Sequence, residues 1–274
     1  MLRLAQTALL RLYGLFYSPL HTRVGRRVFL ISYAAYKRFE ARGVLALAPI
    51  VPMGSTVCDV GANVGYCTRH FARWVGPRGR VIAIEPEPEN VAELRSEIQR
   101  RGLDHVECVQ AAAGAQTGRG RLVLNRMHPG DHRLGQDGIE VAIITIDDVM
   151  AEREWPRVSL IKIDVQGAEL AVIDGAIETL CRWRPALYVE VDNEALSRQG
   201  TTAASLVMRL EALGYAPHVT VTRGTPRRVE AADVIQRSLA GRYVDVLWLP
   251  SDGAGRRTGA GGPPAVSCDH PSRG

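Results

Sequence analysis

Val57-Cys58-Asp59-Val60-Gly61-Ala62-Asn63-Val64-Gly65-Tyr66 is the stretch that decides how the rest of the chain is interpreted. An apolar, β-prone run ends near Asp59, two glycines follow four residues apart, and the pattern then becomes helical. A strand that enters a helix through such a turn brings backbone N–H groups and the helix dipole to a nucleotide. The stretch therefore predicts a nucleotide-binding turn, and its neighbours must indicate which nucleotide.

Strand and helix patterns alternate along the chain after this stretch. Continuous apolar runs such as Val81-Ile82-Ala83-Ile84 are typical of buried parallel strands. We predict strands at 56–61, 80–85, 105–111, 159–165, 186–192, 216–222 and 243–249, with helices at 65–75, 89–101, 168–182 and 202–213. The alternation predicts a doubly wound α/β domain with a Rossmann-like, mostly parallel, seven-stranded sheet.

One region interrupts the alternation. Residues 121–124 and 141–145 have the pattern of two strands without a helix between them. They indicate an antiparallel insertion whose polar loop, 126–140, would lie over one end of the sheet.

The composition divides the chain into three parts. Residues 1–50 form a basic helical extension, 51–250 the α/β domain, and 251–274 a tail that we predict to be disordered. Eight basic residues fall within 1–42, where Glu40 is the single acid. We predict that the extension packs on the domain as a helical cap, and peripheral contact with a membrane is the alternative.

Charge and cysteine usage narrow the partners and the compartment. The net charge of +5 is concentrated at the N-terminal end and not around a cleft, which argues against a nucleic-acid partner. No apolar run approaches the ~20 residues that span a bilayer. The five cysteines lie far apart without a C-x-x-C pair, a usage typical of reduced thiols rather than of a disulfide framework. We predict a cytoplasmic protein, with the inner membrane face as the alternative location, and the oligomeric state stays open.

The turn residues favour a cationic ligand over a pyrophosphate. Dinucleotide sites prefer G-x-G-x-x-G, whereas the order here is Asp59-x-Gly61-x-Asn63-x-Gly65. An acid at this strand end suits an amino group or a sulfonium, and S-adenosylmethionine carries both without a phosphate. An acid that ends the second strand can accept both ribose hydroxyls, and small residues after the third strand leave room for adenine. We predict S-adenosylmethionine as the cofactor, bound by Asp59, Gly61, Asn63, Gly65, Glu85 and Ala112.

A second group of polar residues ends the later strands at the same edge of the sheet. Asp164 follows the strand 159–165 and is a candidate to orient a substrate hydroxyl, act as a general base or hold a divalent cation. Lys162 lies two residues earlier on the same strand face, so it could pair with a carboxylate or reach into the cleft. Alternation places Glu190 and Asp192 on one face of the next strand. We predict substrate binding by Lys162, Glu190 and Asp192. A divalent metal at these carboxylates is an alternative that we do not favour.

The insertion supplies a candidate imidazole. His132 has a pKa range suited to accepting a proton from an alcohol during methyl transfer, so His132 and Asp164 are the predicted catalytic residues. Arg133 is a candidate to bind an anionic group of the substrate.

These motifs together resemble the FkbM-type S-adenosylmethionine-dependent methyltransferases over roughly residues 43–250. The resemblance rests on the segments Cys58–Gly65, Ile84–Pro86, Asp131–Arg133, Thr145–Asp148 and Ile161–Glu169. The last segment is the most specific, and there the family commonly has Glu where this chain has Gln166, which removes a charge. The resemblance implies a class I methyltransferase fold and O-methylation of a hydroxyl on a sugar, glycan or secondary metabolite.

Two alternatives belong to other classes of protein. An NAD(P)-dependent oxidoreductase is disfavoured by Asp59 and by the absence of a middle glycine at position 63. A non-catalytic binding module docked through the basic N-terminus is encouraged only by Gln166.

Overall fold

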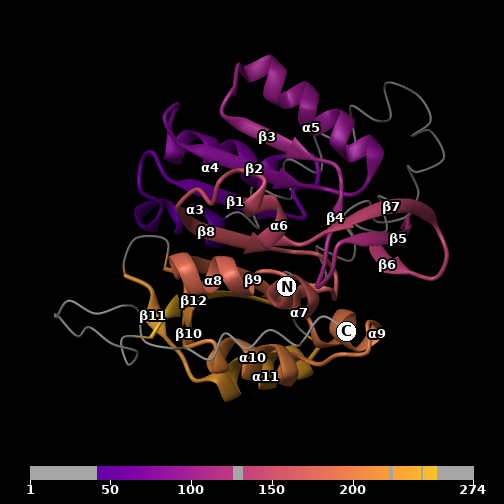
Figure 1. Cartoon of the computed structure of the whole chain (residues 1–274). Helices are drawn as coiled ribbons and strands as arrows, with labels where there is room; N and C mark the ends of the chain where they lie inside the picture. The colour runs from indigo at the N-terminus through magenta and orange to yellow at the C-terminus, as the bar shows by residue number, and fades with distance from the viewer. Residues whose placement is uncertain (1–41, 126–131, 222–224, 242, 252–274) are drawn as a thin grey trace, which may run out of the picture.

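The computed structural model describes residues 42–125, 132–221, 225–241 and 243–251 of the 274-residue chain (Figure 1). Most of the predicted N-terminal extension lies outside the described residues, and so does the predicted tail from residue 252 onward. Ser251 belongs to the domain, because its backbone N–H and its hydroxyl both donate to the Gly214 carbonyl. The division of the chain into three parts stays a prediction.

The core of the molecule is an eight-stranded sheet in the order β11-β10-β12-β9-β8-β1-β2-β3. The pairs from β3 to β9 are parallel, and the three pairs that involve β12 or β11 are antiparallel. The strands are β1 (Thr56–Val60), β2 (Arg80–Ile84), β3 (Val106–Val109), β8 (Val158–Ile163), β9 (Ala186–Val191), β10 (Tyr215–Val219), β11 (Arg227–Arg228) and β12 (Val244–Pro250). All seven predicted strands are present and the α/β class is confirmed. The sheet has one more strand than predicted, because the two-residue β11 is too short to leave a sequence pattern.

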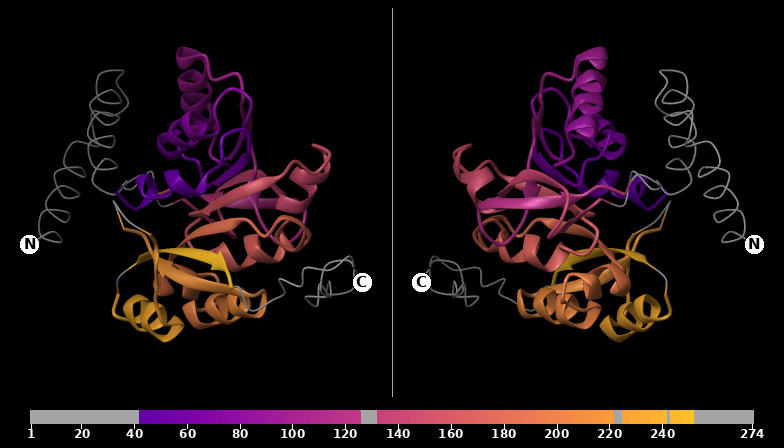
Figure 2. Two further views of the ribbon diagram at one scale, coloured as in Figure 1. Left: turned by 90° about the vertical axis from the view of Figure 1, so that its left-hand side faces the viewer. Right: turned by 90° about the vertical axis from the view of Figure 1, so that its right-hand side faces the viewer.

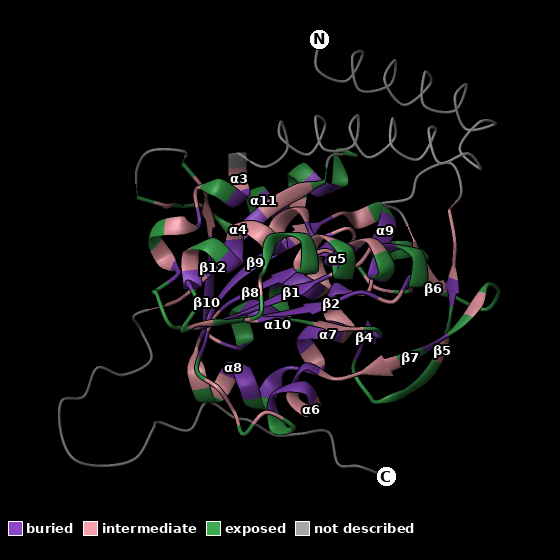
Figure 3. Cartoon of the chain, turned by 90° about the horizontal axis from the view of Figure 1, so that it is seen from above, coloured by how far each residue is buried: buried purple, intermediate pink, exposed green. Residues whose placement is uncertain are grey.

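Helices cover both faces of this sheet, so its central strands are buried (Figures 1 and 3). Successive residues of β1 serve opposite faces: Val57 packs with the buried residues of α4, and Cys58 with those of α6 to α8. The helices are α3 (Arg42–Leu45), the 3-10 helix η1 (Ala48–Ile50), α4 (Tyr66–Val75), α5 (Pro88–Arg101), α6 (Ile146–Ala151), α7 (Glu169–Asp174), α8 (Ile177–Trp183), α9 (Asn193–Arg198), α10 (Ala203–Ala212) and α11 (Ala231–Leu239).

The predicted insertion is present and projects to one side of the main sheet (Figure 2). It forms a second sheet in the order β4-β7-β5-β6, in which β5 pairs antiparallel with both β6 and β7. Its strands are β4 (Ala112–Ala113), β5 (Gly118–Val123), β6 (Arg133–Gly135) and β7 (Ile139–Ile144). Part of the predicted loop 126–140 is thus strand β6, and residues 126–131 lie outside the described residues.

The predicted helix 168–182 is wrong in one respect, because it is two helices. The chain breaks after α7 at Gly175, where an added Cβ would lie 2.1 Å from the Gly114 carbonyl oxygen. The close approach of the Gly114 backbone requires glycine there, and α8 begins two residues later. The short helices α6 and α9 were not predicted, because six residues are too few to display a helical period.

The helices and the cysteines bear on the predicted environment of the protein. No helix in the described ranges is long and apolar enough to cross a bilayer. Cys58, Cys67 and Cys108 are free thiols, whereas Cys181 is disulfide-bonded. The expectation that the cysteines do not form a disulfide framework stays a prediction.

Candidate active site

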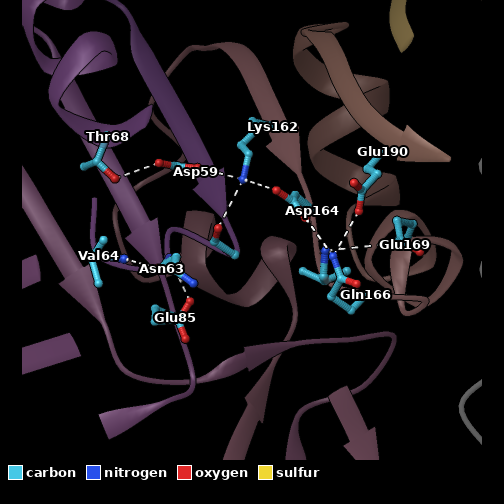
Figure 4. Close-up of polar contacts among 12 residues, drawn as sticks. Asp59, Asn63, Val64, Thr68, Glu85, Lys162, Asp164, Gln166, Glu169 and Glu190 are labelled. Atoms are coloured by element: carbon cyan, nitrogen blue, oxygen red, sulfur yellow. Dashed lines mark hydrogen bonds and ion pairs between the residues drawn. The ribbon is translucent and has the colours of Figure 1, made fainter. Parts of the chain in front are cut away.

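Most of the predicted site residues meet at one edge of the main sheet, where the parallel strands β1, β2, β8 and β9 end (Figure 4). Two groups can be distinguished there. We name them after the roles that the sequence predicts for most of their residues: the cofactor group is the turn after β1 together with Glu85, and the acceptor group is Asp164, Gln166 and Glu190. Lys162 lies between the two groups.

The turn after β1 requires its glycines. Gly61 has φ +73°, and an added Cβ would lie 1.9 Å from the backbone oxygen of Asp164. The turn therefore packs directly against the end of β8. Gly65 also has a positive φ of +86° and is the N-cap of α4, with Leu94 so close that a Cβ would lie 2.6 Å from its side chain. Asn63 adopts the left-handed conformation that asparagine tolerates, and its side-chain oxygen accepts the N–H of Val64.

Glu85 is fixed at the end of β2 and is only 4% exposed. Its Oε2 accepts the Asn63 N–H at 2.8 Å, and its Oε1 accepts the Glu87 N–H at 3.1 Å. Burial raises the pKa of Glu85, and these hydrogen bonds oppose that rise. A carboxylate oxygen has about two lone-pair directions, so Oε2 can accept a further hydrogen bond from a ligand hydroxyl.

Asp59 is completely buried beneath the turn and does not face an open cleft. Thr68 of α4 donates its hydroxyl to Oδ2 at 2.7 Å, and the Lys162 ammonium lies 3.7 Å from Oδ1. Burial raises the pKa of Asp59, while the charge of Lys162 and the Thr68 hydrogen bond lower it. The partner Thr68 was not predicted, because its role depends on α4 packing over β1.

Lys162 connects the two groups. Its Nζ donates to the Gly61 carbonyl at 3.1 Å and lies 3.2 Å from Asp164 Oδ2. The side chain is 7% exposed, so its charge is neutralised mainly by Asp59 and Asp164. Lys162 is therefore a buried cation that joins β1 to β8. Its contact with a substrate stays a prediction.

The acceptor group is held together by an amide. Gln166 Nε2 donates to Glu190 Oε2 at 3.0 Å and to Asp164 Oδ1 at 3.4 Å. Asp192 does not join this group, because its carboxylate accepts the N–H groups of Glu194 and Ala195 as the cap of α9. Within the described ranges, no three His, Cys, Asp or Glu side chains are placed to hold a metal ion.

Glu169 is buried beside the acceptor group. Its Oε1 accepts the N–H groups of Val165 and Gly167 at 3.3 and 3.0 Å. Its Oε2 has no hydrogen-bond partner among the described residues. Burial, reinforced by the charge of Asp164, raises the pKa of Glu169 to about 7. The two hydrogen bonds to Oε1 fix the turn that precedes α7.

This pKa predicts a pH dependence of stability. The folded-state pKa lies above the ordinary value of 4.5, so this group stabilises the fold fully below about pH 4.5, and the contribution is lost as the pH rises to about 7. We expect the free energy of unfolding of the wild type to fall by about 1–3 kcal/mol more than that of Glu169→Gln between pH 5 and 8. Chemical denaturation at both pH values measures this. The exposed Glu211→Gln serves as the control, and equal pH dependence in all three proteins would contradict the prediction.

The remaining predicted residues lie in the second sheet. Ala112 is buried in β4, and Arg133 begins β6 with a half-buried side chain. His132 Nδ1 accepts the backbone N–H of Asn125 at 3.1 Å. This bond occupies the Nδ1 lone pair and places the proton of the neutral ring on Nε2. The arrangement favours His132 as a hydrogen-bond donor and leaves Asp164 as the better candidate for a base.

The fold and the site define the class of protein. The main sheet is mostly parallel, Asp59 precedes the glycine turn after β1, and Glu85 follows β2. These features are typical of the Rossmann-like fold of class I methyltransferases. The Methyltransferase FkbM domain family matches residues 59–217. The chain belongs to this family.

Two methyltransferases are similar to this chain in sequence, and a solved structure can be aligned with it. The 2-O-methyltransferase NoeI of Sinorhizobium fredii is 27% identical over 202 residues, which cover 66% of this chain and 79% of NoeI. The 31-O-demethyl-FK506 methyltransferase FkbM of Streptomyces tacrolimicus is 28% identical over 190 residues, covering 57% of this chain and 70% of that protein. A crystal structure of methyltransferase FkbM from Methylobacillus flagellatus aligns with a TM-score of 0.46 at 18% identity, covering 72% of this chain and 44% of that one. The family membership removes the oxidoreductase alternative.

Proposed function

We propose that the protein transfers a methyl group from S-adenosylmethionine to a hydroxyl of a sugar, glycan or secondary metabolite. The observation that carries the proposal is the continuity of the two groups of the site: Lys162 joins the Gly61 turn to Asp164, so a donor and an acceptor would lie side by side. The names of the two relatives, a 2-O-methyltransferase and a methyltransferase of 31-O-demethyl-FK506, support an oxygen acceptor.

The residues of the cofactor group fit S-adenosylmethionine. Glu85 would accept the ribose hydroxyls, since its carboxylate is oriented by two backbone N–H groups and retains lone pairs. The backbone between Gly61 and Gly65 would approach the methionine part, and the small side chain of Ala112 would border the adenine. Asp59 is too buried for direct contact, so in this proposal it acts by holding Lys162 and the turn.

The chain's contribution to the reaction is mainly orientation. Bound S-adenosylmethionine supplies a methyl group activated by its sulfonium. Asp164, whose side chain is 27% exposed, would accept a hydrogen bond from the acceptor hydroxyl and take its proton as the oxygen–methyl bond forms. Lys162 and Gln166 hold this carboxylate in place, and fixed geometry of this kind accounts for much of the rate of a displacement reaction.

Binding and turnover test the proposal separately. Isothermal titration calorimetry with S-adenosylhomocysteine should give a micromolar or tighter Kd. Transfer of radiolabelled methyl from S-adenosylmethionine should then be measured on a panel of sugars, glycans and polyhydroxylated metabolites. Absence of S-adenosylhomocysteine binding by the full-length protein would contradict the cofactor. Transfer to amine acceptors alone would contradict O-methylation.

Peripheral membrane contact through residues 1–42 remains a separate proposal. Co-sedimentation of the full-length chain with anionic vesicles, compared with neutral vesicles, tests it. Equal pelleting with both vesicles, or with neither, would contradict an electrostatic contact.

A further inference from the structure

The turn after β8 directs one side chain toward two carboxylates. Gln166 adopts the left-handed conformation (φ +55°), which is uncommon for a residue with a side chain. Gly167 follows with φ +102°, and a Cβ there would lie 2.3 Å from the Ala195 carbonyl oxygen. Glu169 fixes the turn from the other side through the N–H groups of Val165 and Gly167. Backbone strain of this kind persists where the surrounding structure imposes it, and it is common at functional sites.

The result of this geometry is a bridge between neighbouring strands. Asp164 follows β8 and Glu190 lies on β9, and the Gln166 amide donates to both (Figure 4). Two carboxylates this close to a common donor would otherwise repel each other or share a proton. A divalent cation is one common solution to such repulsion. Here the neutral amide occupies the position between the two carboxylates.

We propose that Gln166 is a positioning residue that joins Asp164 and Glu190 through its side-chain amide, so that the pair presents oxygens to substrate hydroxyls without a divalent cation. This inference rests on the proposed function for its catalytic consequence. The bridge itself can be tested independently of any methyl acceptor.

The surrounding charges explain why an amide suits this position. Glu169 contacts the same turn from α7, and Asp245 of β12 is the register partner of Glu190 and so lies on the same face. Lys162 is the cation that contacts Asp164, on the oxygen opposite to the one that Gln166 contacts. A fifth carboxylate, at position 166, would add negative charge where the described residues already place four carboxyl groups beside the Lys162 ammonium.

The test compares Gln166→Glu with the wild type by thermal unfolding at pH 5 and pH 8. A carboxyl at 166 would have a raised folded-state pKa through repulsion by Asp164 and Glu190, so its cost would appear as the pH rises above that pKa. We expect equal Tm values within ~2 °C at pH 5 and a Tm lower by about 3–8 °C at pH 8. The double variant Gln166→Glu with Glu190→Gln keeps one amide and the original charge, and it should recover most of this loss.

Calcium provides a second readout. Adding 10 mM CaCl₂ (roughly the weak end of calcium affinities in proteins) should raise the Tm of Gln166→Glu at pH 8 and leave the wild type unchanged. Gln236→Glu, the same change on the exposed face of α11, is the matched control and should respond to neither pH nor calcium. A Gln166→Glu variant that behaves like this control, or a wild type stabilised by calcium, would overturn the bridge.

The catalytic consequence is read from kinetics on an acceptor identified by the panel assay. Gln166→Ala should lower kcat by about 10–100-fold with the Kd of S-adenosylhomocysteine unchanged, and wild-type turnover should be insensitive to EDTA. An unchanged kcat in Gln166→Ala would overturn the positioning role. Failure of the wild type to bind S-adenosylhomocysteine would instead count against the proposed function, so the two failures are distinguishable.

Discussion

Replacing Lys162 with methionine is expected to lower the free energy of unfolding by about 3–5 kcal/mol, because the change leaves buried charge uncompensated. Methionine matches the length of the lysine stem but carries no ammonium. Asp59 is completely buried, and among the residues that the structure describes it would then retain only the Thr68 hydroxyl as a partner. The Gly61 carbonyl would also lose a donor. Urea or guanidinium denaturation at pH 7 measures the loss.

Two further variants identify buried charge as the cause. The double variant Asp59→Asn with Lys162→Met removes the stranded carboxylate, and it should recover more than ~1 kcal/mol of the loss. Arg209→Met breaks the half-exposed Arg209–Asp174 ion pair, and surface pairs contribute only about 0–1 kcal/mol. If Lys162→Met were no more destabilising than Arg209→Met, or if the double variant were worse than the single one, the buried bridge would not have the energetic role assigned to it.

The sequence was most informative where structure is local. The continuous apolar runs correctly predict the central strands β1, β2, β8 and β9, because burial on both faces leaves a pattern within five or six residues. The pattern cannot reveal what lies across two strands. Asp59 and Lys162 are register partners on β1 and β8, about a hundred residues apart in the chain. Their pairing depends on the register of β1 and β8, which no local pattern records.

The acceptor group shows the same limit. Alternation assigned Glu190 and Asp192 to one face, but Asp192 immediately precedes α9 and its carboxylate is used as a cap. The requirement for glycine at position 167 comes from the Ala195 carbonyl, and Gln199 of the following segment donates to the Leu134 carbonyl in the second sheet. These contacts bring β6 toward the acceptor side of the site. They arise from packing between separate elements, so spacing along the chain could not predict them.

The affinity for the cofactor is expected to depend most strongly on Glu85. Hydrogen bonds to a charged group contribute roughly 1.5–3 kcal/mol each, so loss of two to the ribose would weaken binding by roughly 10²–10⁴-fold. Glu85→Ala should therefore raise the Kd of S-adenosylhomocysteine by this factor in calorimetry. Part of the effect would act through the turn, because the Asn63 N–H would lose its acceptor. Glu85→Gln keeps an acceptor oxygen for that N–H. The difference in Kd between Glu85→Gln and the wild type therefore measures the contribution of the second carboxylate oxygen and of the charge.

Glu87 provides the control, because it is a buried glutamate two residues away that contacts a different group of Asn90: Glu87 accepts the Asn90 backbone N–H, whereas Glu85 accepts the Asn90 side-chain amide at 3.3 Å. Its side chain caps α5 by accepting the Asn90 N–H, so Glu87→Ala should cost about 1 kcal/mol of stability. It should change the Kd by less than ~3-fold, since the cap lies on the helix and not on the ribose. Equal losses of affinity in Glu85→Ala and Glu87→Ala would indicate a general loosening of this end of the sheet. Retention of wild-type affinity in Glu85→Ala would remove Glu85 from the cofactor site. A loss of affinity in Glu85→Ala but not in Glu87→Ala, with an intermediate Kd for Glu85→Gln, would show that the Glu85 carboxylate binds the ribose.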